Sequence, residues 1–68
     1  NAKYALQAKD SAKLLIKDLR AKKIDYCLVA LRTRYDYFGG LIYLNREKYK
    51  CVGKFKDSID KDSIVSFL

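Results

Sequence analysis

Two adjacent glycines, Gly39 and Gly40, constrain the fold of this chain more than any other feature of its sequence. They separate two apolar, strand-like segments, Tyr-Cys-Leu-Val-Ala-Leu at 26–31 and Leu-Ile-Tyr-Leu at 41–44. Glycine readily adopts the positive φ angles that a two-residue hairpin turn requires. We therefore predict a β-hairpin over residues 26–44 with the glycine pair as its turn.

A second tight turn at Arg46 and Glu47 extends this hairpin to a three-stranded antiparallel meander in an agreeing register. Side chains then alternate between two faces of the sheet. The expected core face is apolar and contains Cys27, Val29, Leu31, Tyr35, Tyr37, Ile42, Leu44, Tyr49, Cys51, Gly53 and Phe55. The expected solvated face contains Arg32, Arg34, Asp36, Phe38, Tyr43, Lys48, Lys50 and Lys54.

The residues on either side of the meander are predicted to be helical. Residues 2–23 contain no helix breaker, and apolar residues recur there at steps of three and four: Tyr4, Ala8, Ala12, Leu15, Ile16 and Leu19. An alternative begins this helix at Asp10 or Ser11 and leaves 4–8 as a short strand. A short closing helix from about Asp60 is expected at the other end. The predicted fold class is α+β: N-terminal helix, three-stranded antiparallel meander, short C-terminal helix.

The chain is expected to form a single small basic domain over residues 1–68, excised or processed from a longer chain. Its formal net charge is +7, and the charge is uneven along the sequence. Residues 1–56 contain fourteen Lys and Arg against five acids, whereas residues 57–68 contain three Asp and one Lys. A basic balance favours polyanionic partners, although it also serves solubility. No stretch is long and apolar enough to span a membrane.

Catalysis is not expected from this sequence. It contains no His, so the usual proton shuttle and the Ser-His or Cys-His nucleophile pairs are excluded. No metal site or cofactor is predicted. The antiparallel register places Cys27 and Cys51 about 30 Å apart at ~3.3 Å per residue, which favours two buried free thiols; a bend in the first strand would allow them to pair.

The leading hypothesis is a non-catalytic nucleic-acid-binding module, for RNA or DNA, that uses the basic and aromatic sheet face and the end of the helix. Its candidate residues are Arg32, Arg34, Phe38, Tyr43, Lys48, Lys50, Lys54, Arg20, Lys22 and Lys23. The alternative is a protein–protein interaction module, secreted or viral, anchored by Tyr37, Phe38, Leu41 and Tyr43 around the glycine pair. A third interpretation is a structural piece of a larger polypeptide. The sequence does not indicate a compartment.

Overall fold

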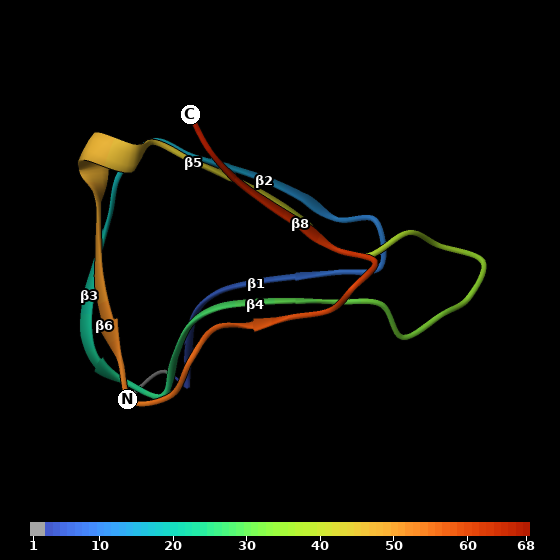
Figure 1. The fold of residues 1–68 in the computed structure, drawn as a ribbon, viewed down its shortest axis with the longest axis horizontal. Coiled ribbons are helices and arrows are strands. Elements are labelled where there is room, and N and C mark those ends of the chain that lie inside the picture. Colours follow the sequence, from blue (N-terminus) through green and yellow to red (C-terminus); the bar gives the residue numbers. More distant parts are fainter. Residues whose placement is uncertain (1–2) are drawn as a thin grey trace.

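A computed structural model describes residues 3–68 and shows a chain wound into a three-sided parallel β-helix. Each turn of the coil is here called a rung, and the strands of successive rungs lie along the three sides of a triangle (Figure 1). The first rung contains β1 (Tyr4–Lys9), β2 (Lys13–Ile16) and β3 (Leu19–Ile24). The second contains β4 (Tyr26–Leu31), β5 (Leu41–Leu44), the 3-10 helix η1 (Arg46–Lys48) and β6 (Tyr49–Gly53). The third contains β7 (Ser58–Ile59) and β8 (Ile64–Phe67).

Strands that occupy the same side of the triangle pair in parallel and form three sheets. Their orders are β1-β4-β7, β2-β5-β8 and β3-β6. The registers stack similar apolar residues on successive rungs, for example Leu6 on Leu28, and Leu14 on Ile42 on Val65. Side chains alternate along each strand, so every second residue points into the triangle. Stacking the rungs therefore builds one continuous core from short strands.

The core is deepest in the second rung because that rung has a neighbour above and below. Its buried apolar residues are Cys27, Leu28, Val29, Ala30, Ile42 and Leu44, and Ala8 of the first rung is also buried. Inward residues of the outer rungs, such as Leu6 and Val65, are only partly buried. Burial of the apolar side chains is thus greatest in the middle rung.

The disulfide between Cys27 and Cys51 fastens the start of β4 to β6 within the second rung. Their Cα atoms lie 6.0 Å apart. The preference for free thiols was therefore wrong, because it depended on an antiparallel register that separates the two residues. In a three-sided coil, the strand that closes a rung returns to the place where the rung began.

The predicted α+β fold is also wrong. Among residues 3–68 there is no α-helix, and every pairing between strands is parallel. The region predicted as an N-terminal helix forms β1, β2 and β3. Apolar and polar residues alternate along each strand, and the corners between the strands interrupt this alternation. The resulting spacing of the apolar residues resembles the steps of three and four that are typical of a helix. Packing against the second rung then overrides the helix propensity of Ala, Leu and Lys. The expected helix from Asp60 is instead a turn, in which the Asp60 carboxylate accepts the Asp62 N–H at 3.2 Å, followed by β8.

The glycine pair does not form a hairpin turn. No glycine has positive φ; Asp10, Ser11 and Lys23 have it instead, at corners of the first rung and at the end of β3. Glycine is required at position 40 because the chain there lies close to the first rung. A Cβ on Gly40 would overlap the Ala8 backbone and lie 2.7 Å from the Ala8 Cβ. The chain does turn near Arg46 and Glu47, but as η1, whose Asn45 side chain accepts the Glu47 N–H at 3.1 Å.

Candidate functional site

The largest departure from a regular coil is the loop of residues 32–38 between β4 and β5, here called the aromatic loop. It projects beyond the corner of the triangle (Figure 1). The equivalent corner of the first rung, between Lys9 and Lys13, is much shorter. The registers on either side agree nonetheless, since Lys9 pairs with Leu31 and Lys13 with Leu41. The loop is thus an insertion into a rung that is otherwise regular.

The Asp10 carboxylate fixes the start of the loop. It accepts hydrogen bonds from the Thr33 hydroxyl, from the Thr33 N–H at 2.6 Å and from the Arg34 N–H at 3.0 Å. The hydrogen bond from the Thr33 side chain, aided by these two amides and by Lys9, lowers the pKa of Asp10 below its usual value. The positive φ of Asp10 places it at the corner where its side chain meets the loop.

Arg32 and Ser11 hold the rest of the loop. The Arg32 guanidinium donates to the carbonyl oxygens of Arg34 and Tyr35 and lies 3.4 Å from the Asp62 carboxylate. The Ser11 hydroxyl accepts the Phe38 N–H at 2.8 Å. Side chains from the first and third rungs therefore hold both ends of a loop that belongs to the second.

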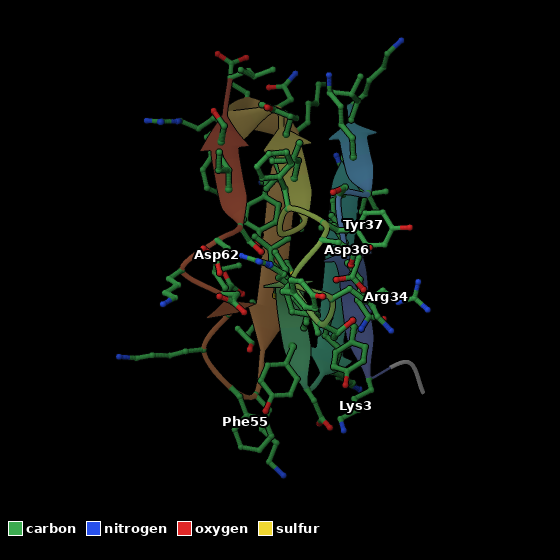
Figure 2. The ribbon with its side chains drawn as sticks, turned by 90° about the vertical axis from the view of Figure 1, so that its right-hand side faces the viewer. Lys3, Arg34, Asp36, Tyr37, Phe55 and Asp62 are labelled. Carbon is green, nitrogen blue, oxygen red and sulfur yellow. A yellow bond between two sulfur atoms is a disulfide. The ribbon has the colours of Figure 1, made fainter. Side chains whose placement is uncertain are left out.

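The aromatic side chains of this loop are exposed rather than packed. The exposed fractions are 90% for Tyr35, 79% for Phe38 and 43% for Tyr37. Figure 2 looks at the molecule from the side of the loop and shows Arg34, Asp36 and Tyr37 together on it. The Arg34 guanidinium lies 5.9 Å from the centre of the Tyr37 ring. The backbone of the loop is thus held in place, while its three aromatic rings are exposed beside the charged side chains of Arg34 and Asp36.

The residues proposed for nucleic-acid binding do not share a face. Arg32, Arg34 and Phe38 lie in the aromatic loop, Tyr43 on β5, and Lys48 in η1. Arg20 and Lys22 on β3 lie beside Lys50 on β6, whereas Lys23 and Lys54 lie at or beyond the ends of those strands. The predicted basic sheet face is absent because the meander that defined it is absent. Nothing in the fold supports nucleic-acid or RNA binding.

The residues proposed for a protein anchor are only partly brought together. Tyr37 and Phe38 lie in the aromatic loop, whereas Leu41 and Tyr43 lie on β5, where the Lys13 ammonium contacts the Tyr43 ring at 5.4 Å. The sequence reasoning missed Tyr35, which it assigned to the core face, and Asp10, which it placed within the predicted helix or, in the alternative, at one of two possible helix starts. The sequence contained one sign of an exposed loop, namely a polar and aromatic stretch between two apolar, strand-like segments.

No protein-family model, curated protein or solved structure matches this chain. Within residues 3–68, no group of three or more His, Cys, Asp or Glu side chains is arranged to hold a metal ion. The part of the chain that the structure describes also has no helix of the length and apolar character needed to cross a membrane.

Proposed function

We propose that this chain is a non-catalytic protein-interaction module in which the β-helix presents the aromatic loop to a partner protein. The observation that carries the proposal is the contrast between an anchored loop backbone and exposed aromatic side chains. In repeat folds, insertions into individual repeats form surface loops that often supply the binding face. Tyr35, Tyr37 and Phe38 contribute little to the core, so a binding role accounts for their presence.

The chemistry of the loop suits a protein surface. Aromatic and Arg side chains are enriched among residues that dominate binding energy at protein interfaces. Tyr in particular offers a large contact area at a low cost in side-chain entropy. The hydrogen bonds that Asp10 and Ser11 accept from backbone N–H groups of the loop restrict it before it binds, which reduces the entropy lost on association. Arg34 and Asp36 beside the rings provide polar contacts at the rim of such an interface.

The disulfide is relevant to the compartment in which the proposed module works. Structural disulfides persist in oxidising environments, such as the cell exterior, and are rare in the cytosol. The bridge between Cys27 and Cys51 therefore supports a module that works in an oxidising compartment.

A peptide-display selection against the wild-type chain tests the proposal. Selected binders are measured against a loop variant, Tyr35→Ser with Phe38→Ser, and against a matched variant, Leu15→Ser, which removes an exposed apolar residue from β2. We expect most binders to lose about tenfold or more in affinity for the loop variant, because truncated interface anchors cost roughly 1–2 kcal/mol or more. Leu15→Ser is expected to have little effect. If the binders have equal affinities for the two variants, the loop is not the interaction site.

A further inference from the structure

The net charge of this chain is concentrated on the side of the triangle that β3 and β6 form. Residues 17–24 and 46–54, which contain these two strands and the residues beside them, have eight Lys and Arg against two acids. The rest of the sequence has seven Lys and Arg against six acids. Most of the formal charge of +7 therefore belongs to this one side.

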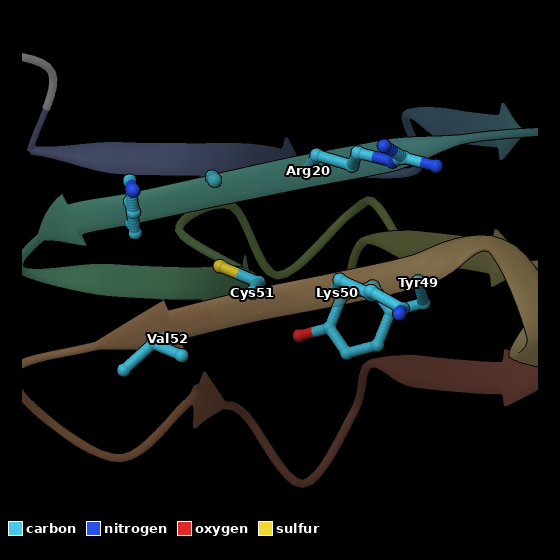
Figure 3. A pocket seen from close by; sticks show the side chains of 7 residues that line it. Arg20, Tyr49, Lys50, Cys51 and Val52 are labelled. Carbon is cyan, nitrogen blue, oxygen red and sulfur yellow. The ribbon is translucent and has the colours of Figure 1, made fainter.

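Three of these cations project from the outer face of the β3-β6 sheet. Lys50 lies between Tyr49 and Cys51, which pack against the core, so the alternation along a strand directs Lys50 outward. Arg20 is its partner in the register, and Lys22 lies two residues further along β3; all three are exposed. Figure 3 shows Arg20 and Lys50 on the two neighbouring strands. Rungs stack along the coil axis, whereas these side chains point away from it, so a neighbouring rung extends this face rather than covering it.

The charges of this face are poorly neutralised. In the described chain, Arg20 approaches the Asp18 carboxylate at 4.0 Å, and neither Lys22 nor Lys50 forms an ion pair. Like charges on neighbouring strands repel each other and destabilise the sheet. An anion bound between Arg20 and Lys50 would relieve this repulsion. The face is therefore complementary to a polyanionic ligand.

The face is also hollowed. An open depression of about 770 Å³ lies across β3 and β6, and Arg20, Lys22 and Lys50 are among the residues that line it. Val52, which is 72% exposed, adds an apolar side chain to the same lining. A chain-like ligand can enter such a depression, whereas a flat membrane surface would contact only its rim. The lining suits a polymer that carries anionic groups on units with an apolar face.

We propose that the outer face of the β3-β6 sheet binds a sulfated polysaccharide. The sulfate groups accept hydrogen bonds from Arg20, Lys22 and Lys50, and the planar guanidinium of Arg suits such oxyanions because it donates two parallel hydrogen bonds. Clusters of Lys and Arg are typical of surfaces that bind heparin-like polymers. The C–H groups of a sugar ring cover Val52. The disulfide supports an oxidising setting such as the cell exterior, where sulfated polysaccharides are also found.

This face differs from the predicted nucleic-acid-binding face in its composition. Phe38 lies in the aromatic loop and Tyr43 on β5, so the two rings that were expected to stack on bases are not part of it. A ligand here is held mainly by its charge. The face lies on a different side of the triangle from the aromatic loop and does not depend on the function proposed for that loop (Figure 1).

A fluorescently labelled heparin oligosaccharide of defined length is the probe, and its binding is followed by anisotropy. We expect saturable binding that Arg20→Gln with Lys50→Gln weakens about tenfold or more, which corresponds to about 1.4 kcal/mol. Lys9→Gln with Lys61→Gln is the matched control, because it makes the same change in net charge at exposed positions on β1 and between β7 and β8. Circular dichroism confirms that both variants keep their strand content. Equal weakening by the two variants, or no binding to the wild-type chain, would overturn the proposal.

Unlabelled competitors test the chemistry of the ligand. A desulfated oligosaccharide of the same length is expected to compete about tenfold less well, because it lacks the sulfate groups. The loop variant, Tyr35→Ser with Phe38→Ser, is expected to bind the heparin probe with unchanged affinity, which separates this site from the one proposed for a partner protein. If a poly-aspartate peptide of equal charge or vesicles of an anionic phospholipid compete better than heparin, the face serves a protein or a membrane and the proposal is wrong.

Discussion

Reduction of the Cys27–Cys51 disulfide is expected to remove a large part of the stability of this chain. The bridge closes a loop with a sequence separation of 24 residues, which is almost the whole second rung. In the chain-entropy account, cross-linking a loop of this length stabilises the folded state by about 3.5 kcal/mol, through loss of freedom in the unfolded chain. A domain of this size has a total free energy of unfolding of about 3–10 kcal/mol. The bridge therefore supplies a large fraction of the free energy of unfolding of the isolated chain.

Urea denaturation followed by circular dichroism measures this contribution. The oxidised chain is compared with the same chain unfolded and refolded in a phosphine reductant, because Cys27 is almost fully buried and reacts slowly when folded. The reduced chain keeps both side chains, so the comparison isolates the cross-link from any change in core volume. With a denaturant dependence of about 1 kcal/mol per molar urea, a loss of about 3.5 kcal/mol lowers the midpoint by about 3.5 M. A fall of less than 1 M would refute the reasoning and would mean that the unfolded chain already keeps the two cysteines close together.

Two further predictions concern contacts that hold the second rung and its loop. Gly40→Ala is expected to destabilise the chain severely, by about 3 kcal/mol or more, since the new Cβ would overlap the Ala8 backbone. Gly53→Ala is the control, because its Cβ would meet its nearest atoms at 3.2 Å and require only small shifts. Equal urea midpoints of the two variants would contradict this explanation. The lowered pKa of Asp10 means that its ionised form stabilises the folded loop. This contribution is complete above the pKa of an unfolded Asp, 3.8, and is lost as pH falls through the lower pKa of the folded state. We expect the amide resonances of Thr33 and Arg34 to shift together below about pH 4 and to stop doing so in Asp10→Asn; a shift that persists in that variant would assign the titration to another group.

The sequence identified several strands correctly but not their pairing. Segments 26–31 and 41–44 were predicted as strands and are β4 and β5. Two strand-like segments separated by two glycines are typical of a hairpin, and nothing local distinguishes a hairpin from strands on two sides of a coil. The distinction depends on contacts between rungs, such as that of Gly40 with Ala8, which are remote in sequence.

One repeat in the sequence did indicate the coil. Tyr-x-Leu-x-Ala occurs at Tyr4 and again at Tyr26, and the register pairs these two copies residue by residue. The two tyrosine rings and Phe55 of the next turn form a stack with ring centres 5.7 and 5.3 Å apart. Repeats of 20–50 residues are the signature of solenoid folds. This repeat is hard to recognise because the second turn is lengthened by the aromatic loop and by η1, so the spacing is not constant.

The same irregularity explains how the fold accommodates the aromatic loop at a small cost in stability. Between paired positions Lys9 and Leu31 on one side and Lys13 and Leu41 on the other, the second rung has nine residues where the first has three. Tripling a flexible connection adds only about 1 kcal/mol to the entropic cost of closing it, and the hydrogen bonds that Asp10 and Ser11 accept from the loop offset part of this. The registers of β4 and β5 are unchanged by the insertion, so the stacked core is also unchanged. The coil thus fixes where the loop begins and ends, and the exposed side chains of Tyr35, Tyr37 and Phe38 stay available for the interaction that we propose.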